Sequence, residues 1–320
     1  MEREIIEFLK DNKETYISGE EISRKLNVSR TAVWKHIQNL KENGYEIIAQ
    51  PHYGYRLLGI PDRLLPDEIG YRLKTKIFGK RIFSYVSTTS TNDVAYMLAK
   101  QSMQEGALIL SEKQTKGRGR MGRQWSSPSG GGLYFSLILR PKITPSEAGK
   151  ITLMASICIA KILRDSFGLE AVIKWPNDVY VGRDKICGIL TEMNAEQDGI
   201  NFIILGIGIN LNTDINKLPK GAASLKSKTK QQINRIHFLQ KLLCELERYY
   251  FKIKNSEFED IITQWRDLSI TLGRRIKVKW RSNLIEGQAM DIDSSGALIV
   301  RDDFGFSHHI LSGDVTLIKN

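Results

Sequence analysis

The chain has 320 residues, which gives room for two or three domains and a sizeable hydrophobic core. Its 47 Lys and Arg outnumber 36 Asp and Glu, and the net charge of +11 favours anionic partners such as nucleic acid, nucleotides or an acidic protein. The cysteines, Cys158, Cys187 and Cys244, lack the spacing of a zinc site or a disulfide framework, so we expect them to be reduced and buried. The N-terminus is too polar for a signal peptide and no apolar run approaches the ~20 residues of a membrane span, so we expect a soluble cytoplasmic protein without membrane contact.

Residues 1–62 are predicted to form a winged helix-turn-helix domain. Apolar residues recur at helical spacing in three short segments, around Ile5, Ile22 and Val33. Ser29 can cap the third helix, and two short strands follow around a turn at residues 45–58. Three helices followed by a hairpin are typical of this DNA-binding fold.

The third of these helices is the candidate DNA-contacting element. Residues 22–41 include five basic side chains and no acidic one. The predicted DNA-binding residues are Ser29, Arg30, Thr31, Lys35 and Gln38. A protein-docking module is the alternative, because residues 1–60 carry nine basic and nine acidic side chains. The coincidence of helix spacing and wing favours DNA.

Residues 63–270 are predicted to form an α+β domain, a mixed sheet backed by helices. We expect strands at 82–86, 107–111, 133–139, 172–175, 179–181, 186–191 and 202–209. We expect helices from Ser90, over 145–167, and over two later stretches centred on Leu243 and Ile262. Residues 271–320 alternate apolar and polar side chains between regularly spaced glycines, which predicts a small all-β, barrel-like domain.

One segment between two predicted strands combines glycines with arginines; we call residues 116–123 the Gly/Arg loop. Gly117, Gly119 and Gly122 have the spacing of a dinucleotide-binding fingerprint. However, residues 124–132 are too rich in Ser, Pro and Gly for the helix that the fingerprint requires, and Arg140 lies near the position expected for an acidic residue. Glycines let a ligand approach closely and arginines match phosphate or carboxylate, so we predict a loop that closes over an anion. The alternative is a disordered basic loop without a ligand.

Three further motifs could contribute to the same site. Residues 174–178 form a Pro-containing turn, in which Asp178 could bind Mg²⁺ or hold an arginine of the loop; a plain β-turn is the alternative. Lys185 could stabilise charge on a substrate carboxylate and a phosphate, or be a strand-end lysine that reaches solvent. Gly188 and the stretch 206–210 suggest that something approaches the strand backbone closely, or only close packing of sheet and helix.

Several catalytic motifs are missing from the sequence. There is no GxxxxGK[ST] phosphate loop, no GxSxG elbow and no histidine spacing suited to a metal, apart from the adjacent pair at 308–309. Arginines in a loop, a lone lysine and an Asn/Asp turn indicate activation of a carboxylate by ATP. The protein would then position charges while Mg²⁺ neutralises the leaving pyrophosphate.

Four motifs together resemble the biotin–protein ligase family. They are Gly117-Arg118-Gly119-Arg120-x-Gly122-Arg123-x-Trp125-x-Ser127-Pro128, Lys174-Trp175-Pro176-Asn177-Asp178, Lys185-x-x-Gly188-Ile189-Leu190 and Gly208-Ile209-Asn210. With the N-terminal helix-turn-helix, the chain is similar to the bifunctional members, which ligate biotin and repress transcription. The resemblance covers all three regions and implies a biotin/lipoate ligase-like central domain and a C-terminal SH3-like β-barrel.

The resemblance also implies the reaction and its control. Biotin and ATP, with Mg²⁺, would give biotinyl-5′-adenylate and pyrophosphate, and a lysine of the biotin carboxyl carrier protein of acetyl-CoA carboxylase would then receive the biotin. The adenylate would act as corepressor by promoting a homodimer that binds operator DNA and represses genes of biotin synthesis and transport.

Residue roles follow from the same resemblance. Those implied in catalysis are Lys185, Arg118 and Arg120. Those implied in biotin binding are Ser90, Thr91, Asn92, Gln114, Gly117, Arg118, Arg120, Lys185 and Gly188. Those implied in nucleotide binding are Arg118, Arg120, Arg123, Trp125, Asn177, Lys185, Asn210 and Ser224, with Asp178 as a metal ligand and residues 222–225 in a second loop that closes on the adenine.

Three alternatives remain at this point. Ser129-Gly130-Gly131-Gly132 is similar to the related lipoate ligases, which share the catalytic fold. A transcription factor whose large domain only senses a ligand would need one anion site and no catalytic lysine. A ligase whose N-terminal unit has lost DNA binding is the third.

Overall fold

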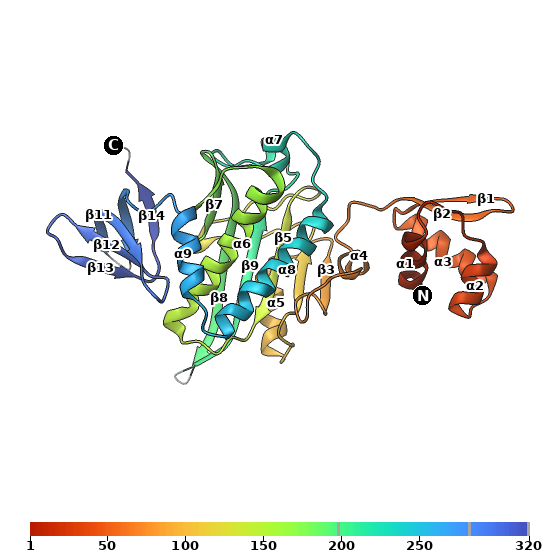
Figure 1. The fold of residues 1–320 in the computed structure, drawn as a ribbon, viewed down its shortest axis with the longest axis horizontal. Helices are drawn as coiled ribbons and strands as arrows, with labels where there is room; N and C mark the ends of the chain where they lie inside the picture. The colour runs from red at the N-terminus through yellow and green to blue at the C-terminus, as the bar shows by residue number, and fades with distance from the viewer. Residues whose placement is uncertain (197–198, 281–282, 319–320) are drawn as a thin grey trace. The chain divides into compact units, whose positions relative to one another are not determined.

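The computed structural model describes residues 1–196, 199–280 and 283–318. The chain divides into two compact units, Met1–Tyr71 and Arg72–Asn320 (Figure 1). No helix in the described part of the chain is both long and apolar enough to cross a membrane. The cysteines Cys158, Cys187 and Cys244 are all free, and Cys244 is only partly buried.

The first unit has the predicted winged helix-turn-helix fold. Its elements are α1 (Glu2–Asp11), α2 (Gly19–Leu26), α3 (Arg30–Glu42), the antiparallel hairpin of β1 (Glu46–Gln50) and β2 (Gly54–Gly59), and the short α4 (Pro66–Gly70). Apolar residues of all three long helices and the hairpin share one core, which includes Ile5, Ile22 and Val33. The unit continues through α4 because buried Glu68 accepts a hydrogen bond from Tyr45 (2.6 Å).

The second unit is built on a seven-stranded mixed sheet of order β3-β4-β5-β9-β8-β7-β6. Only β3 and β4 are parallel. The strands are β3 (Ile82–Tyr85), β4 (Leu108–Ser111), β5 (Leu133–Leu139), β6 (Ala171–Lys174), β7 (Asp178–Val181), β8 (Asp184–Glu196) and β9 (Gly199–Ile209). The helices are α5 (Thr91–Lys100), α6 (Gly149–Phe167), α7 (Leu225–Thr229), α8 (Arg235–Lys254) and α9 (Glu259–Leu268), with short 3₁₀ turns η1 (Arg120–Gly122), η2 (Pro145–Ala148) and η3 (Ile215–Lys217).

The two faces of this sheet are covered by different helices. On one face α5 packs Ala95 and Ala99 against Ile138 of β5 and Ile204 of β9. Glu192 of β8 lies opposite Ile204 and shares its face of the sheet. Side chains alternate along a strand, so the preceding Thr191 points to the other face, where its hydroxyl hydrogen-bonds that of Thr152 of α6 (2.8 Å). Figure 1 shows α6, α8 and α9 together over that second face. Both faces of the sheet are thus covered by helices, and the loops at the strand ends lie beside them.

Most boundaries lie within a residue of the predicted ones, but two elements and one helix cap differ more clearly. The helix expected over 145–167 begins as η2 and becomes α-helical only from Gly149. The hairpin of β8 and β9 extends beyond the predicted strands, because its polar outer residues continue the ladder to Glu196 and Gly199. Ser90 stands at the start of α5 but its hydroxyl does not cap the helix; Gln114 Oε1 accepts from the backbone N–H of Thr91 instead (2.8 Å).

The C-terminal region is an antiparallel five-stranded sheet of order β13-β12-β11-β10-β14. Its strands are β10 (Arg275–Trp280), β11 (Asn283–Ile292), β12 (Leu298–Asp302), β13 (Ser307–Ile310) and β14 (Asp314–Leu317). β13 and β14 lie at opposite edges and do not pair with each other in the described residues. The all-β prediction is confirmed, but closure into an SH3-like barrel is not.

The buried guanidinium of Arg235 joins the two ends of the long segment that connects β4 to β5. Arg235, at the first turn of α8 and 1% exposed, donates to Glu112 Oε2 (2.7 Å) just after β4 and to the carbonyl of Gly132 (3.1 Å) just before β5. The Gly/Arg loop lies between these two positions. Its stems are thus held together by one residue of α8.

Candidate active site

Glycines clear the floor of a pocket on the α5 face of the sheet. Gly188 of β8 lies opposite Gly208 of β9, and Leu190 lies opposite Gly206. A Cβ atom at Gly208 would lie 2.4 Å from Trp125 Nε1, and one at Gly206 would lie 2.1 Å from Asn92 Oδ1. Because Gly206 and Gly208 have no side chains, Asn92 and Trp125 can pack directly on the backbone of β9.

Lys185, at the start of β8, points into this pocket. Its ammonium lies 2.7 Å from Asp178 Oδ1 and 5.3 Å from the centre of the Trp125 ring. Its backbone is held by Gly221 and by the second loop that follows it: the Lys185 N–H donates to the carbonyl of Gly221 (2.9 Å), and the Lys185 carbonyl accepts from Ala223 N (3.1 Å). Trp125 therefore packs over the glycine floor beside a lysine whose position the main chain fixes.

Two arginines of the Gly/Arg loop face the C-terminal sheet. Arg120 donates to Asn177 Oδ1 (3.4 Å) and to the carbonyl of Gly313 (3.1 Å), and both partners are neutral. Burial lowers the pKa of the Arg120 guanidinium, although Asp178 and Asp314 oppose the shift. Arg123 forms an ion pair with Asp314. A partly buried guanidinium with only neutral hydrogen-bond partners among the described residues suits an incoming phosphate.

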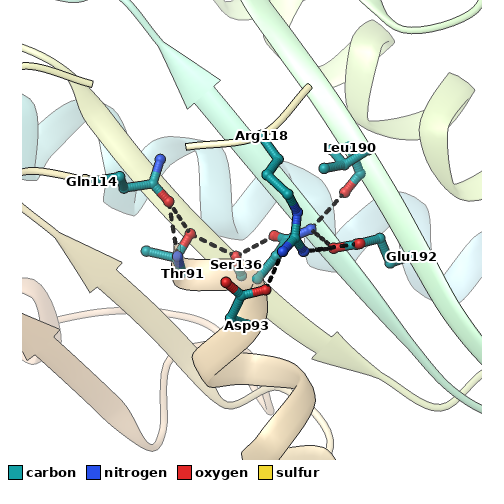
Figure 2. Close-up of polar contacts among 8 residues, drawn as sticks. Thr91, Asp93, Gln114, Arg118, Ser136, Leu190 and Glu192 are labelled. Atoms are coloured by element: carbon teal, nitrogen blue, oxygen red, sulfur yellow. Dashed lines mark hydrogen bonds and ion pairs between the residues drawn. The ribbon is translucent and has the colours of Figure 1, made fainter. Parts of the chain in front are cut away.

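Arg118 takes a different direction from the other loop arginines. It donates to both carboxylate oxygens of Glu192 (3.0 Å each) and forms an ion pair with Asp93, as Figure 2 shows. Burial lowers the pKa of this guanidinium, but the contacts with Asp93 and Glu192 outweigh burial and the pKa lies above its usual value. Arg118 thus connects the Gly/Arg loop to α5 and to β8.

A buried polar network lies beneath Arg118 (Figure 2). Ser136, fully buried on β5, donates to Asn92 Oδ1 (2.6 Å) and lies 2.8 Å from the Thr91 hydroxyl. Asn92 Nδ2 donates to Glu192 Oε2 (2.6 Å) and lies 3.3 Å from the carbonyl of Leu190. The network holds the first turn of α5 against the sheet, so the start of that helix forms a rigid wall of the pocket.

Three buried polar atoms near the pocket make no hydrogen bond among the described residues: Trp125 Nε1, Asn210 Oδ1 and Asp178 Oδ1, whose contact with the Lys185 ammonium (2.7 Å) is an ion pair only. The Asn210 amide nitrogen lies 3.3 Å from the carbonyl of Ala223. Buried donors and acceptors are nearly always satisfied in proteins, so atoms of this kind indicate a missing ligand or water. The Ser224 hydroxyl, by contrast, has a partner within the protein: it caps α7 by accepting from Ser227 N (3.3 Å).

The described residues contain no group of three or more His, Cys, Asp or Glu side chains that could hold a metal ion. The adjacent His308 and His309 pair with different carboxylates, those of Asp302 (2.7 Å) and Asp293 (2.9 Å). Asp178 is engaged by Lys185. One carboxylate beside the loop arginines suits a Mg²⁺ ion that is bound together with a phosphate group, since Mg²⁺ often takes few protein ligands and completes its shell with phosphate and water.

The structure brings most of the predicted site residues together around one pocket. Those that line it are Ser90, Thr91, Asn92, Gln114, Arg118, Arg120, Arg123, Trp125, Asn177, Asp178, Lys185 and Gly188. Gly117, Asn210 and Ser224 do not line it, although a Cβ at Gly117 would lie 2.5 Å from the carbonyl of Trp125. The sequence reasoning missed Asp93, Ser136 and Glu192. Strand alternation could have found Glu192, which follows Gly188 and Leu190 on the same face of β8.

The predicted DNA-binding residues share the outer surface of α3 in the first unit. Arg30, Thr31 and Lys35 are exposed and Gln38 is partly exposed, while the Ser29 hydroxyl caps the helix by accepting from Ala32 N (3.1 Å). The sequence reasoning missed Trp34, which lies on the same helix between these residues and is 56% exposed. Aromatic side chains are enriched in binding interfaces, so Trp34 beside these basic residues suits a binding face.

Fold and site together define a class of protein. The second unit is an α+β ligase-type domain with a lysine and loop arginines around a glycine-floored pocket, and the first unit is a winged helix-turn-helix. Residues 83–210 match the Biotin/lipoate A/B protein ligase family, residues 271–317 the Biotin protein ligase C terminal domain, and residues 2–56 an HTH domain.

Relatives identify the family. The chain is 36% identical over 321 residues to the Bifunctional ligase/repressor BirA of Bacillus subtilis, covering 99% of this chain and 98% of the relative. It is 29% identical over 309 residues to the protein of the same name from Escherichia coli, covering 94% and 92%. The solved biotin protein ligase from Aquifex aeolicus in complex with biotin and ATP matches with a TM-score of 0.63 and 27% identity, over 75% of this chain and all of that one. The chain therefore belongs to the biotin–protein ligase family and combines ligase and repressor roles, as predicted.

Proposed function

We propose that the glycine-floored pocket binds biotin and ATP and forms biotinyl-5′-adenylate. The observation that carries the proposal is the position of Lys185, fixed by its backbone beside Asp178 and Trp125 and sharing the pocket with the loop arginines. Biotin would lie toward the wall at the start of α5. The nucleotide would lie toward Trp125 and the second loop, where the unsatisfied atoms of Trp125 and Asn210 would find partners.

The proposed residue roles follow this division of the pocket. At the biotin end the contacts would come from Ser90, Thr91, Asn92, Gln114, Gly117 and Gly188. At the nucleotide end they would come from Arg120, Arg123, Trp125, Asn177, Asn210 and Ser224. Lys185 and Arg118 would serve both substrates where the two meet. Asn92 has three of its hydrogen-bonding positions occupied by protein partners, so its proposed role is to shape the wall.

In the proposed first step a carboxylate oxygen of biotin attacks the α-phosphorus of ATP and the bond to pyrophosphate breaks. The reacting groups are all anionic, so most of the catalysis is positioning and charge stabilisation. Lys185 would leave Asp178 to contact the carboxylate and the α-phosphate, and Arg120 would stabilise charge on the leaving pyrophosphate. Asp178, once released by Lys185, would hold a Mg²⁺ ion, which would supply further neutralisation of that charge.

In the proposed second step a lysine of a biotin carboxyl carrier protein attacks the acyl carbon of the adenylate. An amide bond forms, the bond to the phosphate oxygen breaks and AMP leaves. The attacking amine has to be neutral, and its pKa is ~10.4 in isolation, so the step requires loss of a proton from the amine. Free cysteines in the chain agree with a cytoplasmic site for this reaction.

The test is pyrophosphate–ATP exchange with Mg²⁺, run with biotin, with lipoate and with neither. We expect biotin-dependent exchange, and a loss of about 10²-fold or more in Lys185→Gln, as for removal of a preorganised charge donor. Lys279→Gln is the matched control, because Lys279 is exposed on β10, outside the pocket. Exchange with lipoate alone would instead assign the pocket to lipoate, and no exchange in a folded sample would leave a ligand-sensing repressor.

We also propose that the adenylate is the corepressor and that two chains with bound adenylate form a homodimer on a palindromic operator. The exposed basic face of α3, with Trp34, supports DNA contact by this helix. Gel shifts with and without biotin and ATP test the proposal. We expect operator binding only with both substrates and a steep fall in affinity with salt. A shift that is independent of substrates would contradict the corepressor role.

A further inference from the structure

The carboxylate of Glu192 is shared by two parts of the pocket. Its Oε2 accepts from Asn92 Nδ2 (2.6 Å), and Asn92 lines the pocket at the first turn of α5. Both of its oxygens accept from Arg118 Nη2 (3.0 Å each), which belongs to the Gly/Arg loop (Figure 2). Glu192 is thus the meeting point of the pocket wall and the loop.

The chemistry of this contact requires a carboxylate. An ionised carboxylate is an acceptor on both oxygens, so it can receive Asn92 and Arg118 together. A glutamine in the same place would present one oxygen and one NH₂ group, and the NH₂ would face a donor on one side. The contact with Arg118 is also charge-assisted, which makes it stronger than a neutral hydrogen bond.

The wall has little freedom to adapt without Glu192. Asn92 rests on the bare backbone of Gly206, where a Cβ would lie 2.1 Å from Asn92 Oδ1, and the same oxygen accepts from Ser136 (2.6 Å). The oxygen of the Asn92 amide is therefore fixed by the sheet and by Ser136. A ligand that shifts Asn92 can move only its amide nitrogen, which contacts Glu192. Asp93 also lies in the first turn of α5 and forms an ion pair with Arg118, so it anchors the loop to the helix directly and not through the Asn92 amide.

We propose that Glu192 is a positioning residue that couples occupancy of the biotin end of the pocket to the seating of the Gly/Arg loop. Biotin against the Ser90–Asn92 wall holds Asn92 and Glu192 in place, and Glu192 holds Arg118 over the substrate. The inference rests on the proposed assignment of this end of the pocket to biotin.

The experiment compares tryptic cleavage within the Gly/Arg loop with and without saturating biotin, in the full chain. The loop offers Lys116, Arg118, Arg120 and Arg123 as cleavage sites, and mass spectrometry locates the cuts. Biotin affinity is measured separately by calorimetry for each variant. The variants are Glu192→Gln, Asp93→Asn and, as matched control on the same strand, Glu196→Gln, whose carboxylate accepts from the Asn201 amide (3.1 Å) at the far end of β8.

We expect biotin to slow cleavage in the unsubstituted chain and in Glu196→Gln. In Glu192→Gln the slowing should fall by roughly tenfold or more, because hydrogen bonds to a charged group are lost, while biotin still binds. Asp93→Asn should raise cleavage both with and without biotin and keep the ratio between them. That difference separates coupling from a role that only anchors the loop.

Three outcomes would overturn the inference. Equal biotin protection of Glu192→Gln and the unsubstituted chain would show that the coupling does not pass through Glu192. Biotin-dependent exchange without any biotin protection in the unsubstituted chain would show that there is no coupling, although the proposed function would stand. Absence of biotin binding in the unsubstituted chain would instead reject the proposed biotin site together with the inference.

Discussion

Substitution of Gly208 by alanine tests whether the bare backbone of β9 is needed for catalysis. The added Cβ would lie 2.4 Å from Trp125 Nε1 and 2.5 Å from Trp125 Cε2. Ordinary contacts between such atoms are ~3.5–4 Å, so the indole has to retreat by roughly 1 Å. Trp125 is on a loop and can move, so we expect the alanine to displace the indole without unfolding the sheet.

The displacement should reduce catalysis because the Lys185 ammonium lies 5.3 Å from the Trp125 ring. A misplacement of ~1 Å near reacting groups can cost ~10²-fold in rate, which corresponds to ~2.7 kcal/mol in the activation free energy. The assay is biotin-dependent pyrophosphate–ATP exchange, with thermal unfolding as a check of the fold. Gly149→Ala is the matched control, because a Cβ at Gly149 would meet only the Ser295 carbonyl at an ordinary 3.5 Å.

A double substitution decides whether the steric argument is right. Trp125→Gly removes the atoms that the new methyl group would meet, so Gly208→Ala should cost little further activity in a Trp125→Gly background. Full activity of Gly208→Ala, or effects of the two substitutions that simply add, would refute the argument.

Three further predictions concern stability and DNA binding. Buried Glu247 accepts from the backbone N–H groups of Lys76 (2.6 Å), Ile77 (2.7 Å) and Phe78 (2.8 Å). Glu247→Gln should leave one of these N–H groups unsatisfied and lower the free energy of unfolding by about 2–3 kcal/mol. Urea unfolding measures this, and an unchanged midpoint would contradict the prediction. Trp34→Ala should weaken operator binding about tenfold in gel shifts and leave biotin-dependent exchange unchanged; equal operator affinity would remove Trp34 from the DNA-binding face. Hydrogen bonds from Lys150 and then from Thr144 lower the pKa of Glu147 to about 2 from its ordinary 4.5, so its contribution to stability is present above about pH 4.5 and is lost as the pH falls toward 2. Thermal unfolding of Glu147→Gln should accordingly lose less stability than the unsubstituted chain between pH 5 and pH 2, and parallel curves would show that Glu147 does not contribute.

The order of helices and strands could be predicted from the sequence because local patterns determine it. Apolar spacing located the three helices of the first unit and the strands of the central sheet, and turn residues marked the boundaries. The errors lie where tertiary contacts replace a local rule. Ser90 has the residue type of a helix cap, but Gln114, which is distant in the sequence, supplies the acceptor for the first N–H of α5.

The same limit applies to the pocket. The motifs placed Lys185 and the loop arginines in one site, but no local pattern shows that Gly208 makes room for Trp125 or that Gly206 makes room for Asn92. Those contacts depend on the register of β5, β8 and β9, which only the folded sheet establishes. Arg118 likewise has its carboxylate partners at positions 93 and 192, on two different elements. A charged loop can be found in a sequence, but the partners that orient each charge cannot.

Arg235 has a consequence for redesign of the protein. Because one guanidinium joins Glu112 to Gly132, the distance that the intervening chain has to span is set by α8 and not by the loop itself. Closing a longer chain between fixed ends costs only ~0.6 kcal/mol for each doubling of its length. The length of this segment can therefore vary between the same stems at little cost, as long as its arginines and Trp125 keep their partners, which offers a route to ligases with altered acceptor preference on an unchanged scaffold.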